Sequence, residues 1–156
     1  MDWLASRPKF SKPAKAGTAL DAPPALTCKQ LARRTAMLSE AAAIVGKMPR
    51  QGESLHGVMT GRYDLMHILL HILADGGTCQ HLRIATLSFN ERNKVELLRI
   101  LDAGIVARLS LICSIYFRAH QKELYQSTRE EFAKRTGTRI ASPETHCKVI
   151  CFDFGD

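Results

Sequence analysis

Apolar and polar residues follow two different patterns along the chain. Residues 27 to about 47 carry apolar side chains at helical spacing, and Thr27 is suited to cap that helix. Pro23 and Pro24 prevent a helix from forming immediately before it. The polar segment "MPRQGES" then ends the helix, and from residue 54 onward short apolar runs alternate with longer amphipathic segments.

The second pattern predicts a layered α/β domain. The short runs that read as strands cover residues 54–60, 81–89, 106–114, 138–143 and 147–154. The amphipathic segments that read as helices cover residues 63–75, 90–104 and 115–137. Strands that alternate with helices favour a largely parallel sheet flanked by helices.

Composition agrees with one globular domain. The chain has 156 residues, of which 46% are hydrophobic and 24% charged, as in ordinary globular proteins. The longest uncharged apolar run, "LMHILLHILA", is shorter than the roughly 20 residues of a membrane-spanning helix. The first residues lack the apolar core of a secretory signal. We therefore expect no membrane span and a cytoplasmic location.

The net charge of +7 is concentrated near the N-terminus. Residues 1–50 hold nine Lys/Arg and three Asp/Glu, whereas the remaining residues hold thirteen and twelve. We expect a flexible basic tail over residues 1–26, a helix and linker over 27–53, and the α/β domain over 54–156. A basic tail can bind a phosphate backbone, and it can equally be a solvated segment without function.

The cysteines and most histidines favour structural roles. The five cysteines have no C-x-x-C spacing, and we expect reduced thiols that act as small core side chains. His67, His71, Cys79 and His81 could form a zinc site. However, "HILLH" lacks the glutamate of the metalloprotease motif, so core or boundary histidines are the more probable interpretation.

The last predicted strand carries the candidate chemistry. His146 and Lys148 are two residues apart, so on a strand they would share a face, with Cβ atoms about 6.5 to 7 Å apart. An imidazole can attack phosphorus, and an ammonium can neutralise the phosphate oxygens. A lysine on a core strand needs a partner, and a bound anion is a good one. Asp153 lies up to roughly 16 Å beyond Lys148 on an extended strand, which favours anchoring of the following turn.

This segment, "HCKVICFD", resembles the H-x-K-x-x-x-x-D signature of the phospholipase D-like superfamily. The upstream segments "LHGVMTGRYDL", "HLRIATLSFNERN" and "ARLSLICSIYFRAHQKELYQ" are similar to the framework of its small bacterial nuclease-like members. The resemblance covers about residues 54–156. It implies a phospholipase D-like half-domain and a site formed by His146, Lys148 and Asp153.

The resemblance implies a phosphodiesterase, and the basic N-terminus favours nucleic acid over lipid as its substrate. His146 would form a phosphohistidine, Lys148 would bind the phosphate oxygens, and no metal or other cofactor would be required. A second histidine would come from a partner chain in a homodimer. Family members continue to a Gly-Ser-x-Asn segment, whereas only Gly155 and Asp156 follow Phe154 here. We therefore expect a C-terminally truncated half-domain, with an inactive module that binds DNA or a protein as the alternative.

Overall fold

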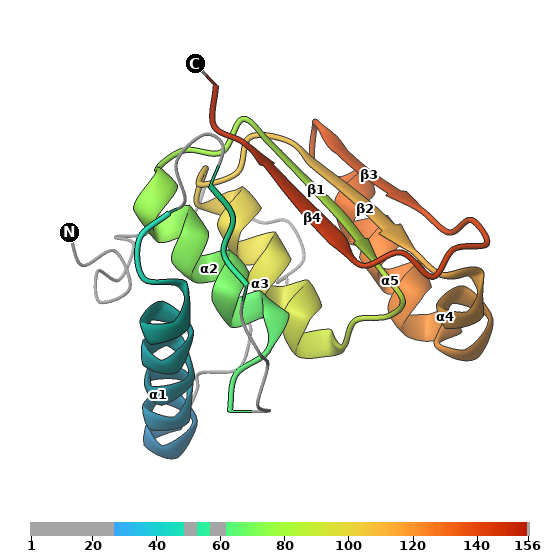
Figure 1. Ribbon diagram of the computed structural model, residues 1–156. Coiled ribbons are helices and arrows are strands. Elements are labelled where there is room, and N and C mark those ends of the chain that lie inside the picture. The colour runs from blue at the N-terminus through green and yellow to red at the C-terminus, as the bar shows by residue number, and fades with distance from the viewer. Residues whose placement is uncertain (1–26, 49–52, 57–61, 156) are drawn as a thin grey trace, which may run out of the picture.

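The computed structural model describes residues 27–48, 53–56 and 62–155. They form the elements drawn in Figure 1. The helices are α1 (Cys28–Val45), α2 (Leu65–Gly76), α3 (Glu91–Asp102), α4 (Ile115–His120) and α5 (Lys122–Ala133). The strands are β1 (His81–Thr86), β2 (Leu109–Cys113), β3 (Thr138–Ala141) and β4 (Val149–Asp153).

The four strands form one mixed sheet in the order β3-β2-β1-β4. β1, β2 and β3 are parallel, as expected, whereas β4 runs antiparallel to β1 at the edge. The reversal follows from the connection. After β3 the chain crosses the carboxyl ends of the strands without a helix that would carry it back, so it enters β4 from the carboxyl end.

Three helices cover one face of the sheet, and the core lies between these two layers (Figure 1). Alternate strand residues point into it because side chains switch faces at every residue. Its fully buried members include Leu82 and Leu109 from the sheet, Leu69 from α2, Ile100 from α3 and Phe132 from α5. Hydrophobic burial on this face therefore holds the sheet in place.

Helix α1 packs outside this layer, against α2 and α3. Ala41 and Val45 of α1 are buried. In addition, the guanidinium of Arg34 lies 2.8 Å from the carboxylate of Glu96 on α3. Among the described residues, no helix is long and apolar enough to cross a membrane.

The predicted helix starts near residues 27 and 90 are confirmed, whereas α2 begins at Leu65 and not at residue 63. Thr27 accepts a hydrogen bond from the Gln30 backbone N–H and completes a capping box with that residue. Asn90 accepts a hydrogen bond from the Asn93 N–H at 2.9 Å. Such caps stabilise a helix locally, which is why the sequence reveals them.

The prediction of one helix over 115–137 is wrong, because the structure has two helices there and the second ends at Ala133. Gln121 adopts φ −123° and ψ 52°, which separates α4 from α5. Both helices contribute to a second buried cluster, in which Cys113, Phe117 and Tyr125 meet. Glutamine is compatible with a helix, so the amphipathic pattern carries no sign of this break.

The predicted strands also differ from the structure. β1, β2 and β3 are shorter than the strands expected over 81–89, 106–114 and 138–143. Residues 54–56 of the expected strand 54–60 have no regular structure, and residues 57–60 lie outside the described part of the chain. The expected strand 147–154 is shorter, because β4 begins only at Val149. The late start of β4 changes the setting of the candidate site, because His146 and Lys148 precede the strand.

Candidate functional site

His146 and Lys148 lie on the segment that leads into β4 and not on the strand itself. The ladder between β1 and β4 ends at the pair Ala85–Val149, so the residues before Val149 have no strand partner. Both side chains are exposed. The expectation of a histidine and a lysine on a core strand is therefore wrong, and Lys148 needs no anion to offset the cost of burial.

The position of this segment is nevertheless one where α/β proteins bind ligands. It crosses the carboxyl ends of the three parallel strands, outside which ligands of open α/β sheets commonly bind. The Ile115 N–H at the start of α4 donates to the Pro143 carbonyl at 3.1 Å. The Cys147 N–H donates to the Thr145 hydroxyl, also at 3.1 Å. These bonds attach the segment to α4 and order its path.

Asp153 lies at the far end of β4. It pairs with His81 across the ladder and is roughly 16 Å from Lys148 at the usual rise per strand residue. Its carboxylate accepts a hydrogen bond from the Gly155 N–H at 3.2 Å. Its carbonyl accepts one from the Gln80 N–H at 2.7 Å. The three motif residues are thus not brought together, and Asp153 has the contacts of a residue that orders the turn after β4.

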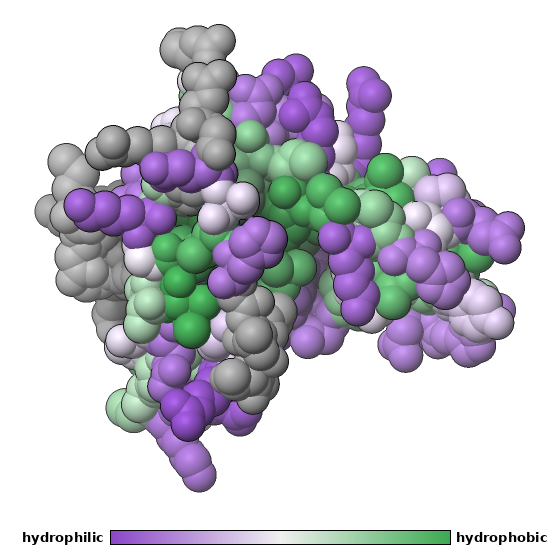
Figure 2. All heavy atoms as spheres, in the orientation of Figure 1, coloured by the Kyte–Doolittle hydropathy of each residue, from purple (hydrophilic) through white to green (hydrophobic). Residues whose placement is uncertain are grey.

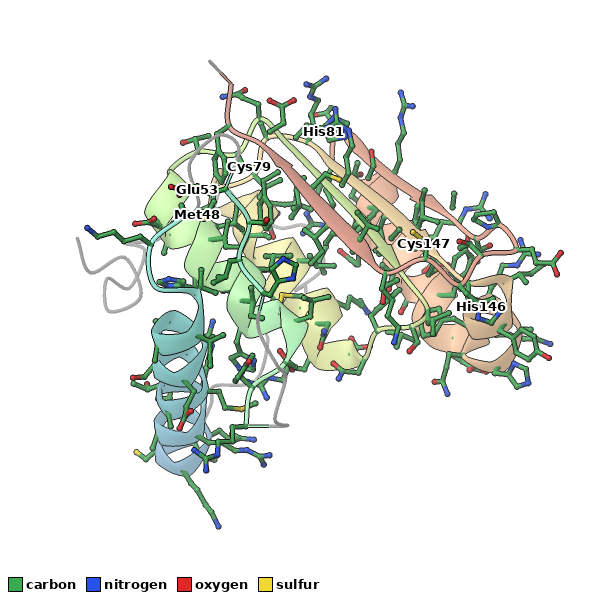
Figure 3. The ribbon with its side chains drawn as sticks, in the orientation of Figure 1. Met48, Glu53, Cys79, His81, His146 and Cys147 are labelled. Atoms are coloured by element: carbon green, nitrogen blue, oxygen red, sulfur yellow. The ribbon has the colours of Figure 1, made fainter. Side chains whose placement is uncertain are left out.

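The two ends of the sheet can be followed in Figure 3. His81 lies at the end where the parallel strands begin, and His146 lies at the opposite end near α4 (Figure 3). Because β4 stays extended between them, a phosphate group near His146 and Lys148 is out of reach of Asp153. The chemistry of the motif therefore rests on the first two residues.

The cysteines divide into two groups. Cys79 and Cys113 are buried, as expected of core thiols, and burial raises the pKa of Cys113 to about 11. Cys28, Cys147 and Cys151 are exposed, which corrects the expectation that all five pack in the core. Cys147 is exposed for the same reason as its neighbours, because it precedes the strand.

The suspected zinc residues have structural partners. His67 is 2% exposed, and its Nδ1 lies 2.5 Å from the Asp64 carboxylate. His71 Nε2 lies 3.5 Å from the Gly46 carbonyl, and Cys79 is part of the core. Within the described ranges, no three His, Cys, Asp or Glu side chains are grouped as metal ligands.

A second group of polar residues escaped the search for motifs. His81 and Arg83 on β1, Ser110 on β2 and Arg139 on β3 occupy the strand positions that alternate with the core positions. They therefore share the face that points away from the helices. The alternation of each strand places these residues on the polar face, but only the strand register shows that they lie side by side.

No protein-family model, no curated protein and no solved structure matches this chain. The chemically relevant features of the site are an exposed histidine and an exposed lysine, two residues apart, at the carboxyl ends of parallel strands.

Proposed function

We propose that this chain is a phosphodiesterase of the phospholipase D-like class and that it cleaves nucleic acid. The observation that supports this most is the exposure of His146 and Lys148 together at the carboxyl ends of β1, β2 and β3. At that position a large polyanionic substrate can approach both side chains. Neither side chain is sequestered by a hydrogen bond or an ion pair with another described residue.

The reaction proceeds in two displacements. An imidazole nitrogen of His146 attacks phosphorus, the bond to the leaving oxygen breaks, and the leaving oxygen takes a proton from a second histidine. Water then attacks the phosphohistidine and gives a proton to the second histidine, the P–N bond breaks, and His146 is regenerated. Lys148 neutralises the phosphate oxygens in both transition states. Asp153 takes no part in proton transfer, because it lies at the other end of β4.

The second histidine is supplied by a second copy of the chain. Because this sequence contains the H-x-K-x-x-x-x-D spacing once, a two-fold dimer that joins two such segments would supply the pair. The substrate is nucleic acid rather than lipid because the excess of basic residues lies within residues 1–50. Four of the nine basic residues in that range fall in residues 1–26, which lie outside the described part of the chain.

Cleavage of a labelled DNA duplex and of a labelled single strand in EDTA tests the proposal. The full chain is expected to cleave at least one, whereas His146→Ala is expected to lose cleavage entirely. Exposed His56, changed to Ala, provides a matched control that keeps the activity. Cleavage that requires magnesium, or that survives in His146→Ala, would overturn the mechanism.

The covalent intermediate gives an independent readout. Quenching with a denaturing detergent at alkaline pH, in a reaction with a substrate labelled at the scissile phosphate, is expected to leave label on the protein at His146. The P–N bond of a phosphohistidine is acid-labile, so digestion and mass spectrometry should follow at neutral or alkaline pH. Label on another residue would assign the nucleophile elsewhere.

A second candidate function is an inactive module that binds DNA or a protein partner. The open setting of His146 favours it, since no described carboxylate contacts and orients the imidazole. In this case removal of residues 1–25 abolishes a salt-sensitive DNA gel shift, while His146→Ala leaves the shift intact. Unchanged binding after the truncation would reject the module that binds DNA through its tail.

A further inference from the structure

The face of the sheet opposite α2, α3 and α5 carries a concentrated positive charge. We call it the open face and define it by His81, Arg83, Ser110 and Arg139, together with Arg108, which immediately precedes β2. Arg83, Arg108 and Arg139 are all exposed. Asp153 is the carboxylate at its margin, 3.8 Å from the Arg83 guanidinium.

Strand register aligns the central residues of this face. Arg83 is the partner of Ser110 across β1 and β2, and Ser110 is the partner of Arg139 across β2 and β3. The three Cα atoms therefore form a row, with the two arginines about 10 Å apart at the usual spacing of strands. Long side chains that start this far apart can both reach a group placed above the serine.

The serine at the centre of the row is held by a histidine. His81 Nε2 lies 2.9 Å from the Ser110 hydroxyl. Partial burial lowers the pKa of His81, and the charges of Arg83, Arg108 and Arg139 lower it further, against the opposing effect of Asp153. A bound anion would relieve the repulsion among these cations.

We propose that the open face binds the phosphodiester backbone of a nucleic acid, with one phosphate above Ser110 between Arg83 and Arg139. Guanidinium groups pair with phosphate oxygens through two hydrogen bonds each, and a hydroxyl adds a second kind of donor. Figure 2 shows an apolar region over the strands with hydrophilic side chains on either side of it. The choice of a nucleic acid as the polyanion rests on the proposed function.

The location agrees with a substrate that contacts both sites. The open-face row is in register with Cys151 of β4, because Arg83 pairs with that residue, and Lys148 lies three residues before it. Three strand residues span roughly 10 Å, which corresponds to about three base-pair steps of a DNA duplex. One continuous backbone can therefore bind the open face and present a phosphate to His146 and Lys148.

The salt dependence of DNA binding tests the inference. Binding of a fluorescent DNA duplex by the full chain is measured by anisotropy at several salt concentrations, in the His146→Ala background to prevent cleavage. Each lost arginine–phosphate contact is expected to reduce the slope of log affinity against log salt by about one. The double variant Arg83→Ala and Arg139→Ala should therefore reduce it by about two.

A matched double variant controls for net charge. Lys122 and Arg129 on α5 are exposed, and replacing both with Ala removes the same charge away from the open face. For this control, the slope of log affinity against log salt should equal that of the His146→Ala parent. Equal slopes for the two double variants would overturn the inference. If the open-face variant fails to fold, single Arg139→Gln gives the same test with an expected change of about one.

Titration of the His81 imidazole by NMR locates the phosphate. DNA bound above Ser110 should raise the pKa of His81, because a negative charge favours the imidazolium. An unchanged pKa in the presence of saturating DNA would overturn this placement. A rise caused by inorganic phosphate but not by DNA would identify a site for free phosphate and overturn the nucleic-acid occupant.

The two proposals fail separately. Binding that depends on Arg83 and Arg139, without any cleavage by the parent chain, overturns the phosphodiesterase and retains the open-face site. Cleavage that depends on His146, with equal salt slopes for both double variants, retains the phosphodiesterase and overturns the open-face site. The arginine variants therefore test binding without relying on the chemistry of His146.

Discussion

At the scale of single residues, the strand boundary at Val149 decides which side chains of the last segment are available. His146, Cys147 and Lys148 precede the boundary and are exposed. A shift of that boundary by a few residues toward the N-terminus would pair them with β1 and bury alternate side chains. Their availability for chemistry is thus a property of the end of the β1–β4 ladder.

Thiol reactivity reports this exposure directly. In the native protein at pH 8, Cys28, Cys147 and Cys151 are expected to react rapidly with a thiol reagent, because all three are exposed. Cys79 and Cys113 should react only on unfolding, since Cys113 is buried and its pKa is raised to about 11. Mass spectrometry of the labelled peptides measures both groups.

Single substitutions provide the control for that labelling. Cys147→Ser should remove one rapidly reacting thiol, whereas Cys113→Ala should leave their number unchanged. Rapid labelling of Cys113 in the folded protein would contradict the burial of β2. Protection of Cys147 would show that the segment before β4 is covered.

At the scale of elements, the end of α5 is held by a cluster of charges. Arg135 donates to both carboxylate oxygens of Asp102 on α3, at 2.6 and 2.8 Å, and also bonds Glu131. A hydrogen bond from Lys134 is the main cause that lowers the pKa of Glu131, and the bond from Arg135 adds to it. These contacts connect the end of one helix to its neighbour.

The lowered pKa predicts how stability depends on pH. A carboxylate with a lower pKa in the folded state stabilises the protein above its unfolded pKa of about 4.5. That contribution is lost as the pH falls from about 4.5 through the folded pKa. Glu131→Gln should therefore lower the melting temperature near neutral pH and make it fall less steeply below pH 4.5, as measured by circular dichroism.

The adjacent residue serves as the comparison. Glu130 is exposed and bonds only the Gln126 amide among the described side chains, so Glu130→Gln should change the acid dependence less. Equal pH profiles for the two variants would show that the Lys134 and Arg135 contacts do not stabilise the folded state.

At the scale of the whole molecule, the last residues of the chain dock on α2. A Cβ atom added to Gly76 would lie 2.3 Å from the ring of Phe154. That ring also stacks on Phe152 at 5.9 Å. The contact joins positions far apart in the sequence and helps to hold the edge strand against the helical layer.

Gly76→Ala tests this docking. We expect the free energy of unfolding in urea to fall by about 1–3 kcal/mol, because the methyl group overpacks a filled site. In a Phe154→Ala background the same change should cost less, since the obstructing ring is gone. Equal costs in both backgrounds would place the end of the chain away from α2.

Most helices and the buried faces of strands could be predicted from the sequence because they depend on residues that are close along the chain. Thr27 and Asn90 cap helices through bonds to residues three positions away, and the alternation around Leu82 marks the buried side of β1. The break at Gln121 was not accessible, since it allows two helices to pack on a cluster with Cys113 and depends on that packing.

The sequence by itself determined most of the order of helices and strands, the caps at Thr27 and Asn90, the buried side of β1 and the H-x-K spacing of His146 and Lys148. Only the tertiary structure decided that β4 pairs antiparallel at the edge, that this pair of residues is exposed and that Asp153 is remote from it. It also placed Arg83 and Arg139 on either side of Ser110. Local patterns set which way a side chain points, whereas partners across a sheet follow from strand order and register, which connect residues distant in the chain.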